Sequence, residues 1–189
     1  MNFRRCISVG LLPLCFIWLS VIEKNISPLI LLLHIAVHEA GHLVAAIICH
    51  SHPSHAEGRY IGMNITFSGN VMSYKNELFI LLSGSMANFL FLFASLFVLP
   101  KFYEFYYLSG IGIALFNLLP LRICDGGKAL SCLLFMLFSE KEAHIVSKTV
   151  YFIFTLLLLI FAISAQFVYS VNLSVLIISI YVFIELILT

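Results

Sequence analysis

The stretch LILLLHIAVHEAGHLVAAIIC, residues 29–49, places three histidines and a glutamate inside an apolar segment long enough to cross a bilayer. Residues four apart share one face of a helix, so His38 and His42 can each direct an imidazole nitrogen at one point, with Glu39 beside them. An ionisable side chain at the centre of a span costs about 2.5 to 3.5 kcal/mol on insertion scales. The stretch therefore predicts a membrane helix in which a bound group offsets this cost.

His38, Glu39 and His42 form the pattern HExxH, in which two histidines bind zinc and a carboxylate deprotonates the water on the metal. Counted back from Cys49 at about 1.5 Å per residue, His42 lies roughly 10 Å and His38 roughly 16 Å from the cytosolic end. A chance match of the pattern occurs in soluble proteins but would be costly within a span. A buried polar cluster or an ion pathway is the alternative to a catalytic zinc site.

Four further histidines lie close to this motif in the sequence. His34 is one turn before His38, and a third ligand from the same helix would be strained around a tetrahedral ion. We therefore expect His34 to pack between helices or to support a ligand. His50, His52 and His55 crowd the cytosolic end of the span, which is typical of a solvated loop, with metal delivery as the alternative.

A catalytic zinc ion usually has three protein ligands, so the motif requires one more ligand at the same depth. Asp125 is the only aspartate in the chain and is followed by Gly126 and Gly127, which allow a tight bend and close approach to another helix. An Asp-Gly turn in a cytosolic loop is the alternative interpretation. Together with HExxH, the sequence favours Asp125 as the third ligand.

The composition is that of a membrane protein, because 62% of the 189 residues are hydrophobic, only 10% are charged and the mean hydropathy is +1.09. A net charge of +1 with scattered basic residues excludes nucleic acid as a partner. The five cysteines have no CxxC spacing, so we expect neither disulfides nor a thiolate zinc site. They are Cys6, Cys15, Cys49, Cys124 and Cys132.

Apolar runs of spanning length predict six membrane helices, with one integral membrane domain over residues 1–189. The first run follows a basic lead without a small-x-small cleavage site, which predicts an uncleaved anchor. Basic residues favour the cytosolic side of a membrane protein. With the N-terminus in the cytosol, eight basic residues lie inside and only Lys24 and Lys101 lie outside, so we predict this orientation. The runs cover residues 6–22, 28–49, 77–99, 103–120, 146–167 and 171–188, and the inside residues are Arg4, Arg5, Arg59, Lys75, Arg122, Lys128, Lys141 and Lys148.

Two cytosolic segments are more than simple links. Residues 58–75 carry β-branched and aromatic residues on both sides of Ser68-Gly69-Asn70, which predicts a small cytosolic or interfacial β-hairpin. Residues 121–139 turn at the Gly126-Gly127 pair and then run apolar for too short a distance to cross the bilayer. We expect a short or re-entrant helix there.

Two asparagines lie in or near the membrane, where polar groups need partners. Asn88 follows the small residues Gly84, Ser85 and Ala87, which let the third span approach the helix of HExxH closely. Asn117 ends the fourth span. Each asparagine stabilises the oxyanion or holds the substrate backbone, or else bonds to a neighbouring helix carbonyl.

These motifs resemble those of the site-2 protease family of intramembrane zinc metallopeptidases. HExxH at residues 38–42, Gly-x-x-x-Asn in GSMAN (84–88) and Asn-x-x-Pro leading to Asp-Gly in NLLPLRICDGG (117–127) occur in the family's order and spacing. Ser85 stands where the family often has proline, and residues 122–124 replace a proline-rich approach to the aspartate. In size and six-span layout, the chain is similar to the sporulation branch, but it lacks room for that branch's CBS region.

The resemblance implies an all-α polytopic membrane protein with a three-helix catalytic core. It implies one Zn²⁺ per chain held by His38, His42 and Asp125, and Glu39 as the acid/base of peptide-bond hydrolysis. The expected substrate is a membrane-tethered protein, such as a sigma-factor precursor, that is cleaved near the cytosolic face. We expect the extended substrate to pair with the hairpin as an additional strand. A bacterial cell membrane is the expected location, and a membrane regulatory or inhibitory protein is a further expected partner.

Two other functional classes compete with this interpretation. A membrane metal-ion transporter or channel would use His34, His38, His42 and the loop histidines as a conduction path. It would leave Glu39 and the Asp-Gly-Gly segment without a shared role. A catalytically silent adaptor would bind partners through the hairpin, and the intact motifs argue against it.

Overall fold

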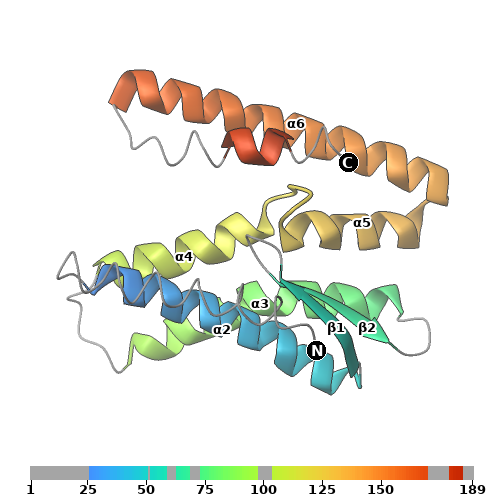
Figure 1. Cartoon of the computed structure of the whole chain (residues 1–189), viewed down its shortest axis with the longest axis horizontal. Coiled ribbons are helices and arrows are strands. Elements are labelled where there is room, and N and C mark those ends of the chain that lie inside the picture. Colours follow the sequence, from blue (N-terminus) through green and yellow to red (C-terminus); the bar gives the residue numbers. More distant parts are fainter. Residues whose placement is uncertain are drawn as a thin grey trace. The chain divides into compact units, whose positions relative to one another are not determined.

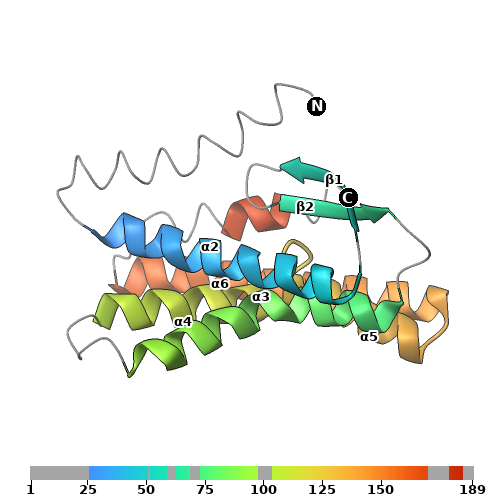
Figure 2. The same cartoon turned by 90° about the horizontal axis from the view of Figure 1, so that it is seen from below.

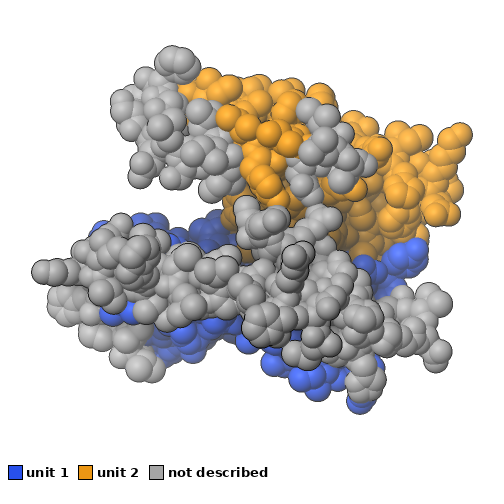
Figure 3. Space-filling model, viewed as in Figure 1, with its two compact units in different colours: residues 1–115 blue, residues 116–189 orange. Residues whose placement is uncertain are grey.

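The computed structural model describes residues 26–50, 52–58, 63–68, 73–97, 104–169 and 179–184. In chain order it contains helix α2, strands β1 and β2 and helices α3 to α6 (Figure 1). The chain divides into two compact units, residues 1–115 and 116–189, coloured separately in Figure 3 and taken here one at a time. The bounds are α2 Ser27–Ile48, β1 His52–Gly58, β2 Met63–Ser68, α3 Tyr74–Ser95, α4 Glu104–Leu118, α5 Asp125–Leu137 and α6 Glu140–Tyr169.

The described helices confirm the predicted helical membrane architecture. The helices α2 and α3 and residues Glu140–Ser164 of α6 are long and apolar enough to cross a bilayer, and they match the second, third and fifth expected spans. The fourth expected span is a helix of only 15 residues, α4. At about 1.5 Å per residue, α4 is shorter than the roughly 30 Å hydrocarbon core. The first expected span, and the sixth apart from a helical segment at residues 179–184, lie outside the described residues.

Small residues and hydroxyl groups hold α2, α3 and the first part of α4 together (Figure 2). A Cβ atom added to Gly41 of α2 would lie 2.6 Å from the Ser83 carbonyl oxygen of α3, so the two backbones are in close contact. Ser83 Oγ lies 3.0 Å from the Gly41 carbonyl oxygen, and Ser85 Oγ donates to the Ala114 carbonyl oxygen of α4 at 3.1 Å. This combination suits a membrane, where the helices gain little from apolar burial alone.

The hairpin lies earlier in the chain than the sequence predicts. β1 and β2 pair antiparallel, with His52 opposite Ser68 and Gly58 opposite Met63, so Ser68 ends the second strand. The expected turn at Ser68-Gly69-Asn70 is therefore wrong, and residues 59–62 separate the strands. The segment with His52 and His55 forms a strand instead of the expected solvated loop. Pairing overrides the weak strand propensity of this histidine-rich segment, and its register shifts between Pro53 and His55.

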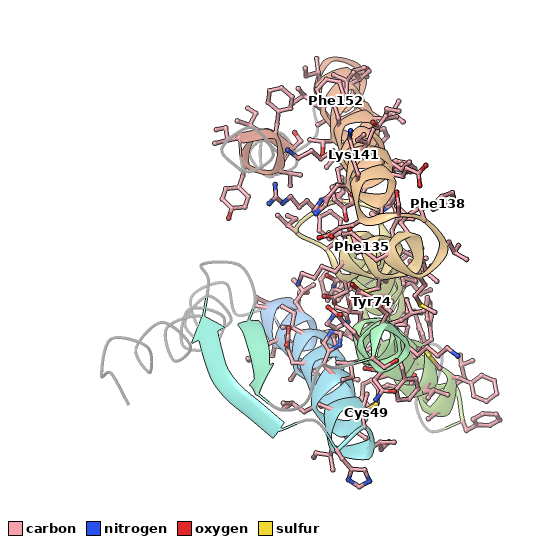
Figure 4. The ribbon with its side chains drawn as sticks, turned by 90° about the vertical axis from the view of Figure 1, so that its right-hand side faces the viewer. Cys49, Tyr74, Phe135, Phe138, Lys141 and Phe152 are labelled. Carbon is pink, nitrogen blue, oxygen red and sulfur yellow. The ribbon has the colours of Figure 1, made fainter. Side chains whose placement is uncertain are left out.

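The second unit contains the end of α4, α5, α6 and residues 179–184. α5 has 13 residues, which confirms a short helix after the Asp-Gly-Gly turn. Phe138, labelled in Figure 4, lies between α5 and α6, which contact each other. Leu121, Cys124 and Val182 form a buried apolar cluster that packs the approach to α5.

The start of α6 is capped by a reciprocal pair of side chains. Ser139 Oγ accepts from the Glu142 backbone N–H at 3.4 Å, and Glu142 Oε2 accepts from the Ser139 backbone N–H at 3.1 Å. The sequence Ser-Glu-Lys-Glu at 139–142 is thus a capping box, which satisfies two amides that have no partner within the helix.

We expect Ser139→Ala to lower the free energy of unfolding by about 1 kcal/mol, because the cap is lost. Denaturation of the purified protein in mixed detergent micelles, followed by circular dichroism, measures the effect. Lys141→Ala, an exposed change in the same turn, is the control and should leave stability within about 0.5 kcal/mol. An equal loss in both variants would contradict a capping role for Ser139.

Candidate metal centre

The structure brings two candidate metal ligands together on α2. The Nε2 atoms of His38 and His42 lie 3.1 Å apart, and the two rings meet nearly at right angles. His38 is 4% exposed, which is unusual for a histidine in the middle of an apolar helix. Two nitrogens that face each other this closely need a proton or a cation between them.

A backbone carbonyl on α3 orients His42. Its Nδ1 atom lies 2.7 Å from the Ile80 carbonyl oxygen, so Nδ1–H donates there and Nε2 keeps its lone pair. This is the arrangement by which metal-binding histidines are usually fixed. The role of Ile80 could not be predicted from the amino-acid sequence, because the group that accepts the hydrogen bond from His42 is a backbone carbonyl oxygen.

The pair fits the geometry of a zinc ion. Two ligands about 2.0 to 2.1 Å from a tetrahedral ion lie roughly 3.3 Å apart, close to the spacing of the two Nε2 atoms. A Cβ atom on Gly84 of α3 would lie 2.5 Å from His42 Nε2 and 2.8 Å from His38 Cε1, so the absence of a side chain there makes room for both rings. Gly84 of GSMAN therefore leaves space for the imidazole pair.

His34 belongs to helix packing and not to the metal pair. It is fully buried, and its Nε2–H donates to the Tyr106 carbonyl oxygen of α4 at 3.0 Å. The ring also lies against Phe91 and Tyr106. A histidine whose Nε2 is bonded to a helix carbonyl does not suit a conduction path along His34, His38 and His42.

Two other candidate residues lie in the first unit. Glu39 is half-buried on α2, adjacent to His38 in the chain. Asn88 is 0% exposed on α3, and neither Oδ1 nor Nδ2 has a hydrogen-bond partner among the described residues. An unsatisfied buried amide costs about 1 to 3 kcal/mol, so the Asn88 amide needs a polar partner.

The remaining candidates belong to the second unit. Asn117 is half-buried in the last turn of α4. Asp125 is the first residue of α5, and its side chain is 14% exposed. Its carboxylate lies 3.5 Å from Lys128 Nζ, one turn later in the same helix.

Cys124 is a buried thiol next to Asp125 in the chain. Burial raises the pKa of its thiol to about 12, with the Asp125 carboxylate adding to the rise and Lys128 opposing it. At neutral pH this raised pKa favours the protonated thiol. Among the described residues, Cys49, Cys124 and Cys132 are not in disulfide bonds, and Cys49 lies at the end of α2 (Figure 4).

Comparison with known proteins identifies the fold. No family model matches the sequence, and no curated protein matches it. The solved structure titled "Site-2 Protease from Methanocaldococcus jannaschii" is similar, with a TM-score of 0.61 and 20% sequence identity. The match covers 95% of this chain and 86% of that chain. The chain thus has the fold of a site-2 protease, as its sequence motifs predict.

Proposed function

We propose that the chain is an intramembrane zinc metalloprotease of the site-2 protease family, which hydrolyses a peptide bond of a membrane-tethered protein. The observation that carries this proposal is the pair of imidazole nitrogens 3.1 Å apart on a helix long enough to span a bilayer. The likeness in fold to a site-2 protease supports it.

One zinc ion per chain would be held by His38, His42 and Asp125. Each of these side chains offers one donor atom of a kind that zinc binds, an imidazole nitrogen or a carboxylate oxygen. Two imidazoles and one carboxylate are a ligand set of catalytic zinc sites, which keep a fourth position open. When bound, zinc would polarise the scissile carbonyl and lower the pKa of water towards 7.

Glu39 would carry the proton in this reaction. Its carboxylate accepts the proton of the attacking water and then gives it to the leaving amine, as a general base and general acid in turn. Its position next to His38 on α2 supports this role.

Asn88 and Asn117 would act on the substrate. Asn88 has a buried amide without a partner among the described residues, which supports a bond from Nδ2 to the substrate carbonyl or oxyanion. Asn117 lies eight residues before Asp125, at the end of α4, and we assign to it the holding of the substrate backbone.

The substrate would add to the β1–β2 hairpin as an extended strand. The sheet has two strands in the described part of the chain, so each strand keeps one edge for backbone hydrogen bonds. β-strand addition exposes a peptide bond that an intact helix would protect. The proposed site of cleavage is the cytosolic side of a bacterial membrane, with the N-terminus of the chain in the cytosol. A sigma-factor precursor is the proposed substrate, and a membrane regulatory protein is a proposed partner.

We expect Asp125→Asn to lower zinc affinity by at least about 100-fold, because an amide is a weak ligand where a carboxylate is lost. Loss of a residue that only orients a metal ligand lowers metal affinity by about 10- to 100-fold, and loss of the ligand itself should cost at least as much as the upper value. Competition with a chelating dye at neutral pH, together with elemental analysis of the purified protein, measures the change.

Lys128→Gln is the matched control, since it removes the ion pair with Asp125 but leaves the carboxylate in place. It should lower zinc affinity much less. A wild-type protein without stoichiometric zinc, or an Asp125→Asn variant that binds zinc as wild type does, would refute the assigned ligand set.

A further inference from the structure

Tyr151 connects α6 to the first turn of α5, the helix that Asp125 begins. Its hydroxyl donates to the Gly127 carbonyl oxygen at 2.7 Å and lies 2.5 Å from Ser131 Oγ. Since a tyrosine hydroxyl has one proton and gives it to Gly127, the Ser131 hydroxyl must donate to Tyr151. The three groups form a directed chain of hydrogen bonds, and Tyr151 is only 7% exposed.

The two glycines after Asp125 lie in close contact with the backbone that precedes them. A Cβ atom on Gly126 would collide with the Leu118 carbonyl, and one on Gly127 would collide with the Leu121 carbonyl. The backbone after Asp125 is thus pressed against the end of α4 on one side and bonded to Tyr151 on α6.

Apolar packing adds to this restraint on the approach to Asp125. Leu121 is 1% exposed and Cys124 is 3% exposed, and they form a cluster with Val182 against which Leu158 of α6 packs. Residues 121–124 contain no proline that would stiffen the approach through the backbone. Contacts with α6 and with residues 179–184 supply the rigidity instead.

We propose that Tyr151 is a positioning residue for Asp125, which fixes the first turn of α5 so that the carboxylate is preorganised for metal binding. This inference rests on the proposed function, in which Asp125 is a zinc ligand. A ligand that must be ordered when the metal binds loses affinity, because part of the binding free energy is spent on fixing it. Removal of the Tyr151 hydroxyl therefore loosens the turn and weakens zinc binding without any change in a ligand.

Tyr151→Phe tests the inference, because it removes the hydroxyl and keeps the buried ring. Thr155→Val is the matched control: Thr155 lies one turn later on α6, is 1% exposed, and its hydroxyl has no partner among the described residues. Ser131→Ala is a third variant, which leaves the bond from Tyr151 to Gly127 in place. All three are compared with wild type as full-length protein in detergent micelles.

Two measurements are made, and one needs no metal. Hydrogen exchange of the zinc-free protein, read by mass spectrometry over residues 119–131, should be faster in Tyr151→Phe and unchanged in Thr155→Val. Zinc affinity, measured with a chelating dye, should fall about tenfold in Tyr151→Phe, less in Ser131→Ala and not at all in Thr155→Val.

The outcomes separate this inference from the proposed function. If wild type binds zinc and Asp125→Asn does not, but Tyr151→Phe equals wild type in exchange and affinity, the inference on Tyr151 fails alone. Equal losses in Tyr151→Phe and Thr155→Val would also overturn it, because they would show a general effect of hydroxyl removal from α6. If wild type binds no zinc, both proposals fail.

Discussion

Glu39→Gln is expected to stop peptide cleavage while zinc remains bound. Glutamine has nearly the size of glutamate and still forms hydrogen bonds, but it cannot accept a proton from water at neutral pH. General acid–base catalysis by one positioned side chain contributes about 10²- to 10⁴-fold to a rate. His38 and His42 are unchanged in this variant, so metal content should stay at the wild-type level.

The measurement uses liposomes that contain the protein and a single-span test protein with a helix-destabilising cytosolic end, and fragments are identified by mass. His42→Ala is the control that should lose zinc and cleavage together, whereas Glu39→Gln should lose cleavage only. If Glu39→Gln still cleaves at the wild-type rate, Glu39 is not the group that carries the proton. Zinc flux into the same liposomes would instead favour a transporter.

The histidine pair could be predicted from sequence because it depends on one helix alone. In a helix the spacing of His38 and His42 fixes their common face, whatever the rest of the fold does. The apolar length of residues 29–49 likewise predicts a span without knowledge of the neighbouring elements. Local periodicity thus determined the element and the relative placement of two candidate ligands.

Features that depend on pairing between segments were harder to predict. The hairpin was expected around Ser68-Gly69-Asn70, but its register places His52 opposite Ser68 and so moves the strands towards the N-terminus. Turn residues indicate several possible turns, and only strand pairing selects one of them. The bond from His42 to the Ile80 carbonyl has no sequence signal, because every residue carries a carbonyl oxygen.

Tyr151 was missed for a related reason. It lies in an apolar run where a tyrosine is ordinary, and its partner is the backbone of Gly127, which is 24 residues away in the sequence. For His34, four-residue spacing alone would indicate a third ligand, whereas strain around a tetrahedral ion favours a packing or supporting role. The bond from His34 Nε2–H to the Tyr106 carbonyl oxygen accounts for the burial of the His34 ring between helices.

Gly84→Ala is expected to abolish stoichiometric zinc binding with little loss of fold. The added Cβ atom would lie 2.5 Å from His42 Nε2 and 2.8 Å from His38 Cε1, closer than non-bonded atoms approach. The clashing atoms belong to side chains, which can rotate away without displacing a backbone. The two imidazoles should therefore separate, and the protein should retain its helices but lose the paired nitrogens that hold the metal.

Gly41→Ala is the matched comparison, because the same methyl group on the facing helix meets different atoms. Its Cβ would lie 2.6 Å from the Ser83 carbonyl oxygen and 2.7 Å from Ala87 Cβ, so α2 and α3 must move apart. Overpacking of this kind costs about 1 to 3 kcal/mol of stability. Elemental analysis should therefore show the larger loss of zinc in Gly84→Ala, and unfolding in detergent should show the larger loss of stability in Gly41→Ala. If Gly84→Ala retains one zinc per chain, the metal is not held beside Gly84 by the His38–His42 pair.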